Sequence, residues 1–540
     1  MGHLTRRGFG RWAVIPIALA FVYAMGSCTR PSPTVGAYAH AKSAEPRTLV
    51  MSYDMLSAWV PARNLAREGA DAAAIKDALH EIIDQHARAG VDVFVQCVFA
   101  RFETQRPGFK SAQPRKDLEQ NGITRLIESG EGLVQIMLER CRSRGMTFLA
   151  GLRMNDRHRT SDFVKRMHDA HPEWKMMGHG INYEYEGARL AVLAFIEECL
   201  DTWDVDGLEF DYLRFGHVFE PSKASGQADL LNDFTRRTRQ LLDAAAKKRG
   251  RERLILGVRV PQTLEECRSL GYDVETWIRE GLVDIVCPSD FFYTDFNART
   301  EDFVALAKGT RCRIYPSVHP VIASGNQATL LDAAAYRGAA KNFYAYGADG
   351  VSAYNYQYNW AQMYGGYKFG PRDMWPAALQ FVAQLRQEAL IDAADRRYLF
   401  HPLWSGRAPT GATKNDRIVL ERAGDAALGE LRFRLAEDFS DSRLAVTMRF
   451  KTTGMVEDDR IEIGVNGKTI ASGAIERRFD ADGQTEDEGR ALEPFFHYRF
   501  VLPSNHLRFG DNMLSARLAE SAGNDRIDIQ EVEIEVAVSD

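Results

Sequence analysis

The chain has 540 residues, of which 45% are hydrophobic and 26% charged, and its formal net charge is −6. This composition is typical of a globular protein, and the length predicts more than one domain. The net acidity gives no support to binding of nucleic acid or of an anionic membrane surface, and the sequence contains no P-loop, no Gly-x-Gly-x-x-Gly motif and no zinc-type Cys/His spacing.

Residues 1–28 have the layout of an export signal, with a basic start, an apolar stretch from Ala13 to Met25 and small residues before Cys28. The run TRRGFGR resembles a twin-arginine export motif. The sequence MGSC resembles a bacterial lipobox and predicts lipidation of Cys28, with ordinary cleavage nearby as the alternative. We therefore expect an exported protein, in the periplasm, at the cell surface or secreted, that contacts a membrane only through such a lipid.

The next segment, residues 29–47, is rich in Pro, Ser and Ala without an apolar period, which predicts a flexible linker. Beyond Cys28, six of the seven cysteines are scattered through the chain without close pairs. An exported protein can form disulfides, but twin-arginine export carries a protein that has already folded in a reducing cytosol. Buried free thiols are therefore the favoured interpretation for most of them.

Eight short apolar runs alternate with segments of helical spacing between residues 48 and 396. The runs begin at Thr48, Val91, Met146, Val205, Leu254, Val283, Cys312 and Asp349. Apolar, β-branched runs are typical of strands buried on both faces. The alternation predicts an α/β fold, a (β/α)8 TIM barrel. The alternative, an open doubly wound sheet, usually has a Gly-rich phosphate loop after its first strand, and none is present.

Residues 397–540 have a different pattern, in which apolar and polar residues alternate between turns rich in Gly, Asn and Asp. Period-two strands at short spacing predict an antiparallel β-sandwich. The stretch LRFGDNMLSARL resembles the end of jelly-roll domains that are attached to glycoside hydrolases. The resemblance leaves two roles open, a carbohydrate-binding domain or a structural one.

Function in a barrel collects where the strands end, and polar or aromatic residues recur at every predicted strand end. In chain order they are Asp54 and Trp59; Arg101 and Glu103; Arg153, Asn155, Asp156 and His158; Glu209, Asp211 and Arg214; Arg259; Asp290 and Tyr293; His319; and Tyr354, Asn355 and Tyr356. A purely structural barrel would not need this set, whereas a polar pocket the size of a sugar would.

The stretch WDVDGLEFDYLRF, residues 203–215, places three carboxylates in an apolar run. Asp206 lies in the turn DVDG and is interpreted as a turn former. On a strand, Glu209 and Asp211 point to the same face, roughly 7 Å apart, and would perturb each other's pKa values. The structural alternative is a buried pair satisfied by arginines of neighbouring strands, for which Arg153 and Arg259 are the candidates.

This stretch, together with RMNDRH and HPEWKM upstream and YDVETWIREGLVDIVCPSD downstream, resembles the family 10-like bacterial glycosyl hydrolases over residues 49–385. The resemblance implies a (β/α)8 protein that degrades polysaccharides. The stretch is also similar to the chitinase motif Asp-Gly-x-Asp-x-Asp-x-Glu, but Glu209 replaces an Asp and Leu213 stands where the essential acid would be. That departure argues against the substrate-assisted mechanism of chitinases.

Hydrolysis of a glycosidic bond needs a proton donor and a second carboxyl group that acts as nucleophile or base. Asp211 is the candidate nucleophile or base, and Asp290 across the barrel is the candidate acid, by analogy with α-galactosidase-like barrels that use strands four and six. Glu209 is the next candidate acid, followed by Asp54 and Glu103. Asp290 could alternatively only cap its turn.

The remaining residues at the strand ends are predicted to bind the substrate. Predicted to hold sugar hydroxyls or an acidic group are Asp54, Arg153, Asn155, Asp156, Arg214, Arg259, His319 and Asn355. Predicted to stack on sugar faces, unless they belong to the core, are Trp59, Tyr293, Tyr354 and Tyr356. No cofactor is expected, and the histidines 158, 171 and 319 lack the spacing of metal ligands. The arginines favour an anionic glycan.

The sequence thus predicts an exported glycoside hydrolase that acts on a poly- or oligosaccharide with two carboxylates. The alternative is a non-catalytic glycan-binding lipoprotein built on a degenerate glycosidase barrel, because Leu213 leaves the second carboxylate unassigned. A third hypothesis is a barrel that acts on a non-sugar substrate, such as a deacetylase or a lyase.

Overall fold

The computed structural model describes residues 45–53, 59–98, 125–126, 129–156, 162–176, 180–290, 293–324, 327–360, 374–402, 416–422, 428–480 and 495–539. All of them lie in one compact unit, residues 38–540. The predicted export signal with Cys28, nearly all of the linker, and the predicted site residues Asp54, Arg101, Glu103 and His158 lie outside the described residues. Among the described helices, none is long and apolar enough to cross a membrane.

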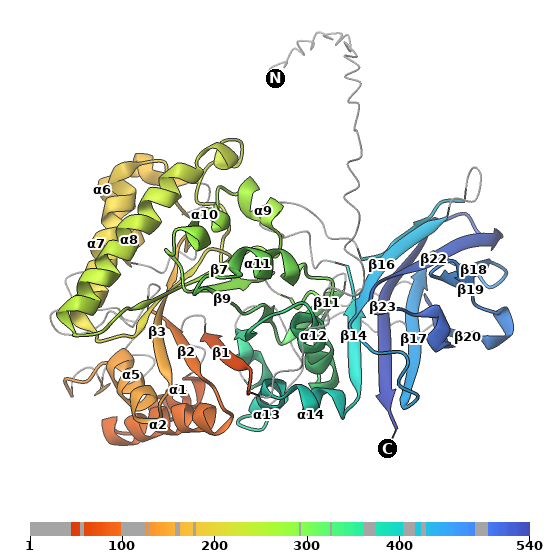
Figure 1. The fold of residues 1–540 in the computed structure, drawn as a ribbon, viewed down its shortest axis with the longest axis horizontal. Helices are drawn as coiled ribbons and strands as arrows, with labels where there is room; N and C mark the ends of the chain where they lie inside the picture. Colours follow the sequence, from red (N-terminus) through yellow and green to blue (C-terminus); the bar gives the residue numbers. More distant parts are fainter. Residues whose placement is uncertain are drawn as a thin grey trace, which may run out of the picture. The chain divides into compact units, whose positions relative to one another are not determined.

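Among the described residues, nine parallel strands form one sheet in the order β10-β13-β1-β2-β3-β6-β7-β8-β9 (Figure 1). The strands are β1 (Thr48–Tyr53), β2 (Val93–Cys97), β3 (Thr147–Arg153), β6 (Gly207–Asp211), β7 (Ile255–Val260), β8 (Ile285–Pro288), β9 (Arg313–Ile314), β10 (Ser317–Val318) and β13 (Gly350–Tyr354). Each of the eight predicted apolar runs contains one of these strands, and the seventh run contains two.

The seventh run is divided because Pro316 has no backbone N–H to give to a ladder. Its neighbours still hydrogen-bond on both sides: the amide of Tyr315 donates to the carbonyl of Val286 at 2.9 Å, and the amide of Ser352 donates to the carbonyl of Pro316 at 3.0 Å. The segment 313–318 therefore connects the strand at one end of the sheet, next to β8, with the strand at the other end, next to β13.

Helices separate the strands and pack their apolar faces against the sheet, where most of the core lies. The α-helices are α1 (Val60–Arg67), α2 (Ala72–Arg88), α5 (Leu133–Ser143), α6 (Asp162–Ala170), α7 (Glu186–Thr202), α8 (Ala228–Lys248), α9 (Leu264–Ser269), α10 (Val274–Arg279), α11 (Thr300–Ala307), α12 (Ala333–Ala345), α13 (Leu379–Ala383) and α14 (Glu388–Asp392). Aspartates cap three of them: Asp71 accepts from the amide of Ala74 at 2.8 Å, Asp273 from that of Thr276 at 3.1 Å and Asp332 from that of Ala335 at 2.9 Å.

Short elements lie in the connections. Two small hairpins are β4 (Lys175–Met176) with β5 (Gly180–Ile181) and β11 (Val321–Ser324) with β12 (Gln327–Leu330). Single turns of 3₁₀ helix are Pro172–Trp174, Ala224–Gly226, Tyr356–Asn359, Gln384–Arg386, Ser472–Ala474 and Ser504–His506. The six described cysteines are buried and free, as predicted for most of them.

The inward face of the parallel sheet changes from apolar to polar along the strands. A separate apolar cluster lies near the strand beginnings and consists of Val50, Val93, Val95, Leu149, Ile285, Cys287 and Tyr315. Because side chains alternate in a strand, the residues two and four positions after Leu149 on β3 share its face, and these are Gly151 and Arg153. Glu209 pairs in register with Gly151, and Asp211 pairs with Arg153. The fold therefore brings the predicted carboxylates to the carboxyl ends of the strands.

The described residues between 396 and 539 form antiparallel sheets, as their period-two pattern predicts. Among the described residues, one sheet has the order β14-β23-β17-β21-β20 with β15 beside β23, and the other has the order β16-β22-β18-β19. Their strands are β14 (Arg396–Phe400), β15 (Ile418–Leu420), β16 (Gly429–Leu435), β17 (Leu444–Thr453), β18 (Arg460–Val465), β19 (Lys468–Thr469), β20 (Glu476–Asp480), β21 (Phe495–Leu502), β22 (Gly510–Glu520) and β23 (Ile527–Val538). Burial alternates along β17 and β22, so each sheet buries one face.

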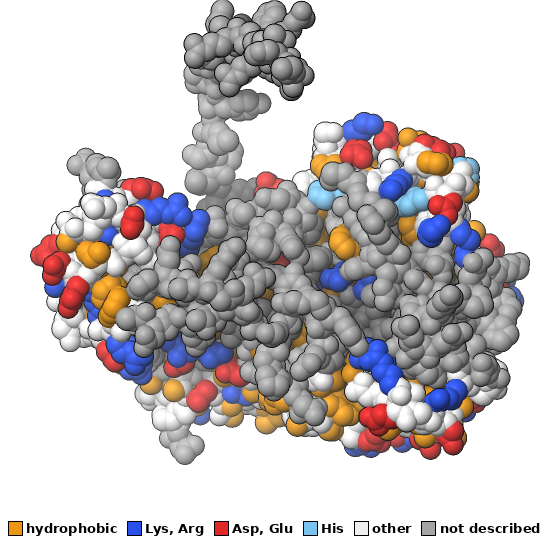
Figure 2. Space-filling model, turned by 180° about the vertical axis from the view of Figure 1, so that it is seen from behind, with side chains coloured by type: hydrophobic (Ala, Val, Ile, Leu, Met, Phe, Trp, Pro, Cys, Tyr) orange, Lys and Arg blue, Asp and Glu red, His pale blue; other side chains and the backbone are white. Residues whose placement is uncertain are grey.

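Buried polar contacts join helix α12 to the antiparallel sheets. The side-chain amide of Asn342 donates to the carbonyls of Phe296 and Arg434 at 2.9 Å each and accepts from the amide of Ala436 at 2.9 Å. A bonded, buried side chain of this kind fixes the register of the elements that it joins. On the surface, acidic and basic side chains both occur across the described part of the face drawn in Figure 2.

Gly207, the first residue of β6, has no room for a side chain. A Cβ atom there would lie 2.1 Å from the carbonyl oxygen of Ile255 on the neighbouring strand. We expect Gly207→Ala to lower the free energy of unfolding by about 2 kcal/mol, because strand backbone must move. Denaturant midpoints measure the effect, with Gly226→Ala as control, since no heavy atom lies within 4 Å of a Cβ at that position. Equal midpoints for both variants would contradict the expectation.

Candidate functional site

Asp211 lies at the end of β6, is 6% exposed, and accepts four hydrogen bonds from described residues. Its Oδ1 accepts from Arg259 Nη1 at 2.6 Å and from the amides of Leu213 and Arg214 at 2.9 and 3.1 Å. Its Oδ2 accepts from the hydroxyl of Tyr354 at 2.8 Å. The carboxylate is therefore fixed from β7, from β13 and from the turn that follows its own strand.

These donors decide the charge of Asp211. Burial raises the pKa of its carboxyl group, but Arg259, the hydroxyl of Tyr354 and the amide of Leu213 outweigh burial, and the pKa lies below its ordinary value. Burial, and after it the charge of Asp211, raise the pKa of Tyr354, so the phenol keeps its proton and donates. Asp211 is thus an ionised, immobile carboxylate at neutral pH.

Arg259 connects Asp211 with the end of β8. Its guanidinium lies over the ring of Tyr354, 3.6 Å from the centroid, and its Nη2 donates to the carbonyl of Asp290 at 2.9 Å. Its Nε donates to Ser289 Oγ at 3.2 Å. One guanidinium therefore holds the side chain of Asp211 and the backbone of Asp290, the two carboxylates chosen from the sequence.

His319 is buried behind this group. Its Nε2 shares a hydrogen bond with Ser289 Oγ at 3.1 Å, and its backbone amide and carbonyl both bond to Thr294 Oγ1. Burial lowers the pKa of the imidazole well below its ordinary value, and the charge of Arg259 lowers it further. His319, predicted to bind substrate, is instead a neutral support for Ser289 and through it for Arg259.

Glu209 lies two residues before Asp211 on the same face and is 3% exposed. Ser52 Oγ on β1 donates to its Oε1 at 2.6 Å. Its neighbours in register are Gly151 and Gly257, which leave space for its side chain. Burial raises the pKa of Glu209 to about 7; Ser52 opposes this and the charge of Asp211 adds to it. Glu209 therefore changes its charge near neutral pH.

The polar side chains at the end of β3 and just after it contact other buried parts of the fold. Arg153 is buried and its Nη1 lies 3.4 Å from Asp156 Oδ1. Asn155 accepts from the amide of Ile181 at 2.7 Å and donates to the carbonyl of His217. The amide group predicted to hold a sugar thus joins the β4–β5 hairpin and the loop after β6 to the end of β3.

Three further residues from the prediction, Asn355, Arg214 and Asp290, differ in their burial. Asn355 is buried, has a left-handed backbone with φ of 52°, and donates from Nδ2 to the hydroxyl of Tyr358 at 3.5 Å. Arg214 is half-buried, and its guanidinium lies 5.8 Å from the ring centroid of Phe215. Asp290 is also half-buried and so is more exposed than Asp211.

The four aromatic residues predicted to stack on sugar faces, unless they belong to the core, are all buried. Trp59, Tyr293, Tyr354 and Tyr356 are all at most 5% exposed. Trp59 and Tyr356 belong to the main core, where the hydroxyl of Tyr356 donates to the carbonyl of Ala378 at 2.6 Å. His171, the other described histidine considered for a metal, stacks on Trp174 with 3.7 Å between the ring centroids. Among the described residues, no group of three or more His, Cys, Asp or Glu side chains could hold a metal ion.

Sequence reasoning missed Ser52 and Ser289, which support the carboxylates. Both lie in apolar runs, and only a strict period-two interpretation of each run places them on the inward face, next to Glu209 and Arg259.

Neither a protein-family model nor a curated protein sequence matches the chain. Similar solved structures include the endo-β-1,4-mannanase from Thermotoga petrophila, with 11% identity, a TM-score of 0.42, and coverage of 90% of this chain and 97% of that one. They also include the PgaB (BpsB) glycoside hydrolase domain from Bordetella bronchiseptica, with 12% identity, a TM-score of 0.39, and coverage of 63% and 99%. A third is catalytic domain 2 of the Group II chitinase from Ostrinia furnacalis, with 12% identity, a TM-score of 0.36, and coverage of 63% and 96%. At these TM-scores the functional argument rests on the residues of the site.

Proposed function

We propose that the chain is a glycoside hydrolase that cleaves a poly- or oligosaccharide with Asp211 and Asp290, within the family 10-like bacterial glycosyl hydrolases. The observation that carries the proposal is Asp211, an ionised carboxylate held by four donors at the carboxyl end of a buried parallel strand. Glycosidases need a carboxylate of this kind beside the sugar carbon that becomes positively charged in the transition state.

We also propose the complete architecture of the chain and its location. The parallel sheet is a (β/α)8 TIM barrel of residues 48–396 that closes through the segment 313–318, and the antiparallel sheets form a jelly-roll-like β-sandwich of residues 397–540. Residues 1–28 are an export signal, Cys28 is lipidated, and the protein acts in the periplasm or at the cell surface.

The two oxygens of Asp211 have different roles in this proposal. Oδ1 already accepts three hydrogen bonds, whereas Oδ2 accepts from Tyr354 alone among the described residues. Oδ2 is therefore the atom that attacks the anomeric carbon or takes the proton of an attacking water. Its low pKa keeps it ready for either role at neutral pH.

Asp290 is the proposed acid that gives a proton to the leaving oxygen. Its backbone carbonyl accepts from Arg259 and from Ser289 at 2.9 and 2.8 Å, so its position is coupled to that of Asp211. Glu209 is less suited to this role because it is 3% exposed and lies deeper on its strand than Asp211. It acts as a charge partner beneath the site.

We expect Asp290→Asn to lower kcat on an unmodified oligosaccharide by about 10²-fold, because the leaving alkoxide is then not protonated. On nitrophenyl glycosides the loss should be much smaller, since nitrophenolate leaves without a proton. Reducing-end and nitrophenolate assays on the same preparation measure both effects. Asp302→Asn, in the first turn of α11, is the control and should change neither rate.

A different outcome identifies the binding alternative. Glu209, one of the two candidate acids, is only 3% exposed, which favours a glycan-binding lipoprotein that has lost catalysis, whereas the half-buried Asp290 does not. In that case the wild type would be retained by a polysaccharide, from a panel of mannan, starch, chitin and acidic glycans, and would release reducing ends from none. Equal losses on oligosaccharides and nitrophenyl glycosides would contradict the acid role of Asp290.

A further inference from the structure

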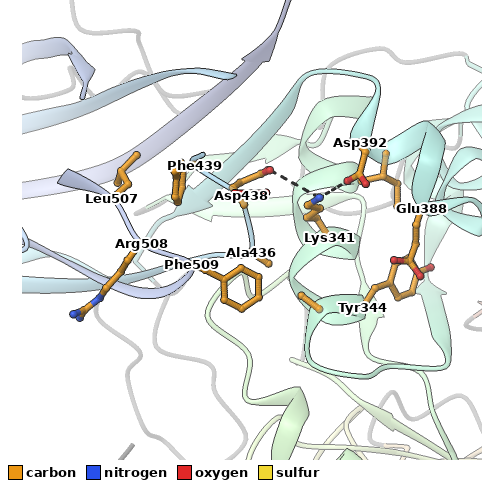
Figure 3. A pocket seen from close by; sticks show the side chains of 13 residues that line it. Lys341, Tyr344, Glu388, Asp392, Ala436, Asp438, Phe439, Leu507, Arg508 and Phe509 are labelled. Atoms are coloured by element: carbon orange, nitrogen blue, oxygen red, sulfur yellow. Dashed lines mark hydrogen bonds and ion pairs between the residues drawn. The ribbon is translucent and has the colours of Figure 1, made fainter. Parts of the chain in front are cut away.

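A cleft of about 480 Å³ lies where the helices of the parallel sheet meet the antiparallel sheets (Figure 3). Its walls are α12, α14 and the segments 436–439 and 507–509, and we call it the junction cleft. Its volume is within the range of about 300–1,000 Å³ that is typical of small-molecule sites.

The junction cleft is distinct from the candidate active site. Glu388 of its lining accepts from Arg47, the residue before β1, and Arg47 also donates to the carbonyl of Ala348, just before β13. The cleft is therefore near the end of the sheet where strands begin. Asp211 lies where β6 ends, so a ligand in the junction cleft does not touch it.

Most charged groups of the cleft have an opposite charge beside them, and the exposed Asp438 and Arg508 add one negative and one positive charge. Lys341 pairs with Asp392, and Glu388 pairs with Arg47. Glu437 is buried and accepts two hydrogen bonds from Arg396 at 2.9 and 2.7 Å. These ion pairs present polar atoms without a strong net charge, which disfavours a highly charged ligand and favours one rich in hydroxyl groups.

Aromatic residues provide the other side of the cleft. Phe439 and Phe509 are half-buried and lie in the loops just after β16 and just before β22. In Figure 3, they lie on the sheet side of the cleft, while Lys341, Asp392 and Glu388 lie on the helix side. A pyranose ring matches this division, since its C–H face packs on aromatic rings and its hydroxyls reach polar groups.

We propose that the junction cleft is a second, non-catalytic site that binds an uncharged saccharide. The cleft itself does not depend on the proposed function; only the choice of a saccharide as its ligand does. A glycosidase that acts on polymers stays bound to its substrate for longer when a second site also binds that polymer.

The test is affinity electrophoresis through gels that contain glucomannan, starch or glycol chitin. Wild type should be retarded by at least one of them, and Phe439→Leu and Phe509→Leu should raise the Kd for that polymer about five- to tenfold. Leucine keeps the apolar volume and the fold, and removes only the aromatic face. Phe479→Leu is the matched control, because Phe479 is a 51% exposed aromatic residue on β20, outside the cleft.

The outcomes separate this proposal from the proposed function. If wild type hydrolyses none of the polymers but the two variants in the cleft still weaken retardation, the junction cleft is supported and the hydrolase function is not. If none of the three polymers retards wild type, or if both cleft variants keep its Kd, the proposal is overturned. It is equally overturned if Phe479→Leu alone weakens retardation, since the saccharide then binds on β20.

Discussion

Replacing Asp211 by Asn should lower kcat by about 10⁴-fold, the upper end of what a positioned carboxylate contributes. Asparagine has the same shape, and its carbonyl oxygen can still accept from the amides of Leu213 and Arg214. It carries no negative charge, so it can neither attack an anomeric carbon nor take a proton from water. The initial rate of reducing-end release, on the polysaccharide that wild type degrades, measures the loss.

The same substitution should also destabilise the protein, and a control must separate the two effects. Arg259 is fully buried, and Asp211→Asn removes the carboxylate charge that its Nη1 bonds, at a cost of about 3–5 kcal/mol in the free energy of unfolding. Asp84→Asn breaks an ion pair away from the site, because the buried Asp84 accepts two hydrogen bonds each from the partly exposed Arg140 and Arg144. That variant should lose stability and keep kcat. A folded Asp211→Asn protein with full activity would remove Asp211 from the mechanism.

The sequence alone predicted the placement of the two carboxylates. The run from Val205 has the period of a strand, so Glu209 and Asp211 had to share a face, and their register beside Gly151 and Arg153 agrees. An arginine of a neighbouring strand, which the structural alternative expected for both carboxylates, bonds one of them: Arg259 donates to Asp211 at 2.6 Å, whereas Glu209 accepts from Ser52. Hydrophobic period and residue spacing are local properties, so they can be determined from the sequence alone.

The partners of these residues could not be predicted in the same way. Tyr354 is 143 positions from Asp211 in the chain, and Ser52 is 157 positions from Glu209. Which side chains meet across the sheet depends on the register of several strands at once. The burial of Trp59 and Tyr356 has the same origin, because an aromatic residue after a strand can turn toward the solvent or into the helix layer with the same local sequence.

Glu209 gives a second strong prediction, in which stability depends on pH. Its pKa is about 7 in the folded protein and 4.5 as the ordinary value, so the native state binds more protons than the unfolded state between these pH values. The contribution of Glu209 is therefore most favourable below pH 4.5 and is lost as the pH rises through 7. The difference of about 2.5 units corresponds to about 3 kcal/mol.

Glu209→Gln should remove this dependence, since glutamine resembles the protonated acid and still accepts from Ser52 through its carbonyl oxygen. Relative to wild type, the variant should gain about 3 kcal/mol in the free energy of unfolding between pH 4.5 and pH 8. Denaturant unfolding at several pH values measures the difference between the two proteins, in which the titration of groups that are unaffected by the substitution cancels. Ser52→Ala is the complementary variant: Ser52 stabilises the ionised form of Glu209, so its removal should raise the pKa further and move the loss of stability to higher pH. Parallel curves for wild type and Glu209→Gln would mean that Glu209 is ionised throughout, and that Ser52 and Arg259 compensate its burial completely.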